Sequence, residues 1–219
     1  MQECTASFSF QARYYRLGHL TPDTRQVWIA LHGYGQLAQY FARKLEPLTY
    51  QNICVLVPEG LSRFYLEDVQ TRSQGGSQRV GASWMTRENR LMDIHNYIGY
   101  LDTVFQNETR HLEHVPPVTV LGFSQGAATA TRWVMHQSVA VSRLILWAGL
   151  LPHDMDFDKG RKLFAGKEVV HVYGTDDPFV TDSRFAEMKE LAQRISDAPT
   201  VLRFEGKHEL HEATLLSLG

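Results

Sequence analysis

A serine between two glycines stands where a buried strand is expected to turn into a helix. The motif GFSQG (residues 122–126) follows the apolar run Val118–Leu121 and precedes an alanine-rich helical pattern. A serine at such a corner is held in a strained backbone conformation that presents its hydroxyl to solvent. The flanking glycines stand where side chains would collide in so tight a turn. Ser124 is therefore a candidate nucleophile, and the alternative is an ordinary helix N-cap.

A catalytic serine needs a histidine base and a carboxylate that orients the histidine. Where the nucleophile occupies this kind of turn, the chain order is serine, acid, histidine. Two acids and two histidines follow later predicted strands: Asp176, Asp177, His208 and His211. The acids could instead form an Asp-Pro turn. The histidines could bind a metal, although no third ligand lies close to them in the sequence. The residues alone leave both pairs open.

Acyl transfer also requires N–H donors for the oxyanion that develops in the transition state. One donor comes from the residue after the nucleophile, here Gln125, and the other from the loop after an early strand. That loop is HGYG (residues 32–35), in which the glycines permit close backbone approach. Taken alone, HGYG could be a plain turn. In order with GFSQG, GTDDP and GKHE at predicted strand ends, it favours an acyl-transfer site.

Apolar runs alternate with helical patterns along most of the chain. Strands are expected at 8–17, 26–31, 52–57, 118–123, 143–147, 168–173 and 200–204. Helices are expected at 37–48, 87–105, after Ser124, at 182–195 and at 212–218. Residues 61–81 and 150–166 show little regular pattern. This alternation predicts an α/β protein with a mostly parallel sheet and helices on both faces. Ligands of such sheets bind beyond the carboxyl ends of the strands.

The bulk composition is that of an ordinary globular protein. The 219 residues suffice for a single domain, residues 1–219, with a substantial core. A net charge of −2 provides no electrostatic footprint for nucleic acid or an anionic membrane. Two cysteines indicate no disulfide framework. Without a signal-peptide pattern or a membrane span, we expect a cytoplasmic enzyme or binding protein.

From Val27 to the C-terminus, the motifs LHGYG, GFSQG, YGTDDPFV and FEGKHEL resemble the carboxylesterase and acyl-protein thioesterase (phospholipase/carboxylesterase) family. The resemblance implies the α/β-hydrolase fold. Its motifs place the catalytic aspartate before the proline, at Asp177, and the catalytic histidine at His208. Tyr34 aligns with the oxyanion-loop residue whose N–H acts with that of Gln125. Tyr173 departs from the pattern, because family members usually carry histidine there.

The resemblance implies a serine esterase that hydrolyses small-molecule carboxylic esters, with thioesters as an alternative substrate. It implies no metal or organic cofactor. Trp84 is expected to form a pocket wall, with a core tryptophan as the alternative. The insertion at 61–81 is expected to act as a lid or to narrow an acyl groove. Hydrophobic residues in 150–164 could line a pocket or a homodimer interface. The rival functions are a non-catalytic binding protein and a serine peptidase or lactonase on the same fold.

Overall fold

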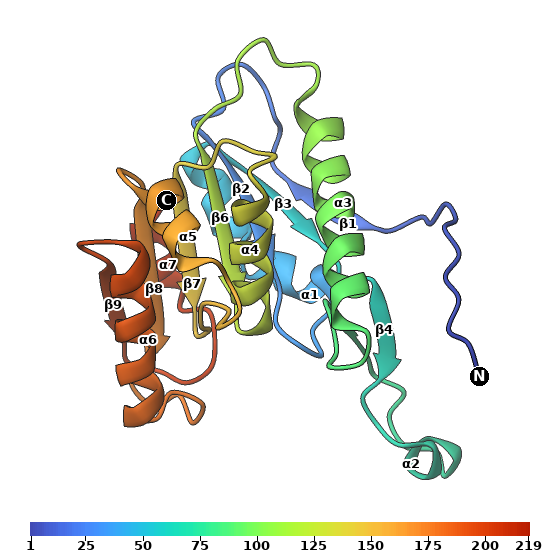
Figure 1. Ribbon diagram of the computed structural model, residues 1–219. Coiled ribbons are helices and arrows are strands. Elements are labelled where there is room, and N and C mark those ends of the chain that lie inside the picture. The colour runs from blue at the N-terminus through green and yellow to red at the C-terminus, as the bar shows by residue number, and fades with distance from the viewer.

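A seven-stranded sheet forms the central layer of the computed structural model, which describes residues 1–219 (Figure 1). Its strand order is β1-β3-β2-β6-β7-β8-β9. The edge strand β1 pairs antiparallel with β3, and all other pairs are parallel. The strands are β1 (Tyr14–Leu17), β2 (Gln26–Leu31), β3 (Ile53–Pro58), β6 (Val118–Phe123), β7 (Arg143–Trp147), β8 (Glu168–Gly174) and β9 (Thr200–Phe204). The predicted mostly parallel sheet is confirmed.

Helices cover both faces of the sheet, and each face has its own hydrophobic core. Successive residues of β2 alternate between the two cores, as side chains of a strand must: Val27 and Ile29 belong to one, Trp28 and Ala30 to the other. The first core is covered by α3 (Arg90–Thr109), α4 (Gln125–His136), α5 (Phe157–Phe164) and α6 (Asp182–Ile195). The second is covered by α1 (Ala38–Arg43), the 3₁₀ helix η1 (Glu46–Gln51) and α7 (Glu212–Ser217).

The register of the parallel strands brings the candidate loops to one edge of the sheet. Leu31 at the end of β2 lies opposite Gly122 of β6, and Phe123 lies opposite Trp147 of β7. Farther along the sheet, Gly174 at the end of β8 lies opposite Phe204 at the end of β9. The loops that follow β2, β6, β8 and β9 therefore meet at the carboxyl edge, where such sheets bind ligands.

The segment 61–81, for which little regular structure was expected, is largely ordered into a hairpin. Strand β4 (Ser62–Tyr65) pairs antiparallel with β5 (Val80–Ser83), and α2 (Val69–Ser73) lies between them. The hairpin projects from the body of the molecule at α2 (Figure 1). Its base is held by tertiary contacts, because Gly35 N–H donates to the Ala82 carbonyl at 2.9 Å. Pairing with a distant loop stabilises strands that local sequence does not favour.

Other differences from the expected elements are small. The first strand begins at Tyr14 rather than at Phe8, and the helix after Leu37 ends at Arg43 and gives way to η1. The irregular stretch 150–166 contains α5, whose N-terminus is capped by the Asp156 carboxylate at Lys159 N–H. No helix has the length and apolar character needed to cross a bilayer.

Replacing Gly126 by alanine is expected to destabilise the protein by about 3 kcal/mol or more. A Cβ at Gly126 would lie 2.2 Å from the Leu31 carbonyl oxygen, so α4 would have to move away from β2. Gly99 in α3 is the matched control, because a Cβ there meets no atom within 4 Å. Gly99→Ala should stabilise by about 0.5–1 kcal/mol. Urea unfolding of both variants measures the difference, and similar effects at the two positions would contradict the close approach.

His171 in β8 is a buried imidazole with no hydrogen-bond partner on either ring nitrogen. Its neighbours across the sheet are Leu146 and Val201. Burial disfavours the charged form and lowers the pKa of His171 to about 4. In the unfolded chain the same group has a pKa of about 6.5. The folded state therefore loses stability as the pH falls from about 6.5 toward 4.

We expect His171→Leu to reduce this acid sensitivity. Relative to the variant, the wild type should lose about 2 kcal/mol of unfolding free energy between about pH 7 and pH 4.5. Urea titrations followed by circular dichroism at both pH values measure it. A wild-type and variant difference that does not change with pH would show that His171 is not held neutral by the fold.

Candidate active site

Ser124 occupies the sharp turn between β6 and α4. Its backbone angles, φ 53° and ψ −117°, are strained for a residue with a side chain. Ser124 N–H donates to the Trp147 carbonyl at 2.8 Å, which ties the turn to the next strand. A Cβ at Gly122 would lie 2.3 Å from the Gly126 carbonyl oxygen, and one at Gly149 would lie 2.4 Å from that of Ser124. The turn therefore requires glycine at positions 122, 126 and 149, where a side chain would collide with backbone.

Asp177 and His208 are brought together by the loops after β8 and β9. Asp177 Oδ2 lies 2.7 Å from His208 Nδ1, and the Asp177 side chain is fully buried. Its other oxygen accepts from Phe179 N–H at 2.9 Å. The His208 ring contacts Phe123, the residue before Ser124, at a centroid distance of 4.9 Å. No hydrogen bond joins Ser124 to His208 in this structure, and such bonds are often long before substrate binds.

The competing residues have other roles. Asp176 is exposed, whereas Asp177 is buried. His211 is the N-cap of α7, where its ring nitrogen accepts from Thr214 N–H, and it stacks on Phe204 at 5.1 Å. No group of three or more residues that could ligate a metal is present. The geometry therefore favours Asp177 and His208 as the partners of Ser124.

The HGYG loop lies directly against the serine. A Cβ at Gly33 would lie 3.1 Å from Ser124 Cβ, so glycine is what allows the loop to approach. Tyr34 N–H has no acceptor within the chain. Gln125 is the first residue of α4, a position at which helical geometry leaves the N–H without a partner. Two unpaired amides thus flank Ser124.

A hydrogen-bond relay through His32 orients the Tyr34 amide. His32 Nε2 accepts from Gly60 N–H at 2.9 Å, so its Nδ1 carries the proton and donates to the Gly33 carbonyl at 2.8 Å. That carbonyl and Tyr34 N–H belong to one rigid peptide plane. The bond from His32 therefore fixes the direction of Tyr34 N–H. Burial lowers the pKa of His32, which favours the neutral form that can both accept and donate.

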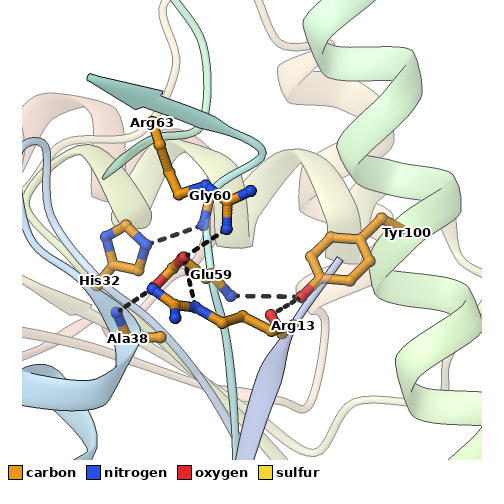
Figure 2. Close-up of polar contacts among 7 residues, drawn as sticks. All are labelled: Arg13, His32, Ala38, Glu59, Gly60, Arg63 and Tyr100. Atoms are coloured by element: carbon orange, nitrogen blue, oxygen red, sulfur yellow. Dashed lines mark hydrogen bonds and ion pairs between the residues drawn. The ribbon is translucent and has the colours of Figure 1, made fainter. Parts of the chain in front are cut away.

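The buried carboxylate of Glu59 lies beside this relay, because Glu59 directly precedes Gly60, the residue that donates to His32 (Figure 2). It accepts two hydrogen bonds from Arg13, at 2.9 and 3.1 Å, and one from Ala38 N–H at 3.2 Å. Arg63 lies 3.6 Å away. Tyr100 joins the same group, because its hydroxyl donates to the Arg13 carbonyl and accepts from Glu59 N–H. The N-terminal segment is thereby fastened to the loop beside the candidate nucleophile.

His32 and Glu59 are site-forming residues that sequence reasoning missed. In the sequence, His32 is the first residue of the HGYG loop, and Glu59 follows closely on the strand expected at 52–57. Glu59 and Arg13 are 46 residues apart. The available signal was a charged residue directly after an apolar strand that neighbours the HGYG strand, because such a residue must find a partner when it is buried.

Trp84 lies in the core rather than on a pocket wall, which corrects the expected role. Its side chain is 1% exposed, packs on Tyr97, and donates from Nε1 to the His32 carbonyl at 2.9 Å. Gln125, by contrast, holds the start of α4 against the segment after β5. Its side chain accepts from Trp84 N–H at 3.1 Å and donates to the Met85 carbonyl at 2.8 Å. Through these hydrogen bonds, Trp84 and Gln125 stabilise the HGYG loop and the start of α4.

Solved structures with the α/β-hydrolase fold resemble this chain over nearly its whole length. Acyl-protein thioesterase 2 of Zea mays is 15% identical, with a TM-score of 0.69 over 95% of this chain and 96% of that one. The Bacillus cereus carboxylesterase is 18% identical, with a TM-score of 0.64 over 94% and 91%. The phospholipase/carboxylesterase of Dyadobacter fermentans is 16% identical, with a TM-score of 0.65 over 98% and 97%. At these identities the likeness establishes the fold.

A family model gives a more specific result. No curated protein matches this sequence. The model of the serine hydrolase (FSH1) family matches residues 24–212, which contain the HGYG loop, the Ser124 turn and the paired Asp177 and His208. The chain therefore belongs to the serine hydrolase (FSH1) family.

Proposed function

We propose that this serine hydrolase cleaves carboxylic esters of small molecules, with Ser124 as nucleophile, His208 as base and Asp177 as orienting carboxylate. The observation that carries the proposal is the 2.7 Å contact between buried Asp177 and His208, set beside a strained serine turn. The carboxylate holds the proton on Nδ1 of His208. The other ring nitrogen, Nε2, is then free to accept the proton of the serine hydroxyl.

In the proposed reaction, Ser124 Oγ attacks the ester carbonyl while His208 Nε2 takes its proton. The carbonyl oxygen becomes an oxyanion, which accepts hydrogen bonds from the Tyr34 and Gln125 amides. Collapse of the tetrahedral intermediate expels the alcohol, which receives the proton from His208. A water molecule, deprotonated by His208, then attacks the acyl-enzyme and releases the acid and free Ser124. Thioesters would react by the same steps with a thiol as leaving group.

The electrostatics of the turn suit this chemistry. The oxyanion forms beside the N-terminus of α4, which carries partial positive charge. Asp177 is buried and hydrogen-bonded, so it can stabilise the imidazolium that appears during each half-reaction. Because the Tyr34 amide is oriented before substrate binds, little reorganisation is needed as charge develops.

Hydrolysis of p-nitrophenyl acetate, butyrate and octanoate tests this proposal. Ser124→Ala, Asp177→Asn and His208→Gln should each lower kcat/KM by about a thousandfold or more. The adjacent competitors supply matched controls, since Asp176→Asn and His211→Gln remove similar groups outside the proposed triad. These two should retain most of the activity, and the profile over acyl length sizes the acyl site.

Two outcomes would overturn the assignment. If a folded Ser124→Ala variant keeps the wild-type rate, the serine is not the nucleophile. If Asp176→Asn or His211→Gln causes the larger loss within its pair, the triad is misassigned. Parallel assays with an anilide and a lactone separate ester hydrolysis from the peptidase and lactonase alternatives.

The His32 relay yields a second kinetic prediction. His32→Ala removes the bond that fixes the Gly33–Tyr34 peptide plane, so kcat should fall about tenfold to a hundredfold with a smaller change in KM. In His32→Asn the side-chain amide can donate near the Nδ1 position and should restore part of kcat. If both variants keep the wild-type kcat and the wild-type thermal stability, His32 does not orient the oxyanion loop.

A further inference from the structure

An open cavity of about 490 Å³ lies between α1 and the β4–β5 hairpin. It begins at Gly35 and Gln36, directly after the proposed oxyanion donor Tyr34. The Gln36 side chain accepts from Gly33 N–H at 2.8 Å, and Gly33 in turn lies against Ser124. Gln36 thus links the cavity to Gly33, the residue that contacts Ser124, and the cavity extends from Gln36 along α1 to Lys44.

Half of the residues that line the cavity are hydrophobic, and its charged residues are all positive. Phe41 and Tyr40 of α1 face Leu66 and Val80 of the hairpin segment. The charged lining residues are two cations, Lys44 and Arg79, and no acid lines the cavity. Glu67, outside the lining, pairs with Arg79 at 2.8 Å. Lys44, at the C-cap of α1, has no carboxylate within ion-pair distance.

The position of His208 decides which part of an ester this cavity can hold. His208 must protonate the leaving group, so the alcohol lies on the side of the His208 ring. That ring lies among Phe123 and Phe179, and neither the loop of His208 nor that of Asp177 contributes to the cavity. The cavity instead begins at Gly35 and Gln36, the residues that follow the oxyanion donor Tyr34. It is placed to receive the acyl arm.

We propose that the enzyme prefers acyl groups that end in a carboxylate, that is, half-esters of dicarboxylic acids, with Lys44 as the residue that binds the distal charge. The methylene chain would lie against Tyr40, Phe41 and Leu66, and the carboxylate would reach the unpaired ammonium of Lys44, with Arg79 nearby. This inference rests on the proposed esterase function. It adds a substrate class and a specificity-determining residue to that function.

The test compares kcat/KM for monoethyl adipate with that for its uncharged isostere, ethyl 6-methylheptanoate, at low ionic strength. The wild type should favour the charged ester. Lys44→Met should reduce the ratio of the two values about fivefold, the size expected for one partly exposed ion pair. Lys44→Arg should retain the ratio, as should Lys189→Met, which removes an exposed lysine of α6. Added salt should lower the wild-type ratio.

Hydrolysis of p-nitrophenyl acetate, whose acyl group is too short to reach Lys44, reports the esterase function separately. If that ester is cleaved but the wild type shows no preference for the charged substrate, the inference fails and the esterase function stands. The inference also fails if Lys44→Met leaves the ratio unchanged or if Lys189→Met lowers it equally. If Ser124-dependent cleavage of p-nitrophenyl acetate is absent, both proposals fail.

Discussion

The strained turn at Ser124 is the constraint on which the rest of the site depends. A residue held at φ 53° and ψ −117° costs about 1–3 kcal/mol, and it persists only where its surroundings fix it. Those surroundings are the sheet register, which sets Phe123 opposite Trp147, and three glycines that let backbone pack at contact distances a side chain would forbid. The same close packing brings the HGYG loop against the serine. One closely packed junction therefore positions both the candidate nucleophile and its proposed oxyanion donors.

The polar parts of the site are assembled from distant segments. The Asp177–His208 pair joins the loops of β8 and β9, while the Glu59–Arg13 pair fastens the chain before β1 to the loop after β3. Each pair contains a carboxylate that is nearly fully buried, and such a group is tolerated only when it is paired and hydrogen-bonded. The first pair would orient the proposed base, His208. The second lies next to Gly60, whose N–H donates to His32 and so helps to fix the orientation of the Tyr34 amide.

The sequence predicts what local pattern and strand order determine. The strands at 118–123, 143–147 and 200–204 and the helix at 182–195 have the expected bounds, because their apolar periodicity is strong. Motif and order place Ser124 and the two competing pairs at strand ends, and the family resemblance implies Asp177 and His208 within those pairs. The β4–β5 hairpin and the Glu59–Arg13 pair could not be predicted, and the sequence left Trp84 open between a pocket wall and the core. Each depends on contacts across tens of residues, which leave no local periodicity.

The most direct test of the central claim is the reaction of the folded protein with a fluorophosphonate, followed by peptide mass spectrometry. A serine activated by His208 in this turn should form one stable adduct, on the peptide that contains Ser124. The adduct should form far more slowly in a folded His208→Gln variant. An adduct on another residue, or none on Ser124 while the protein remains folded, would contradict the account of this site as that of a serine hydrolase.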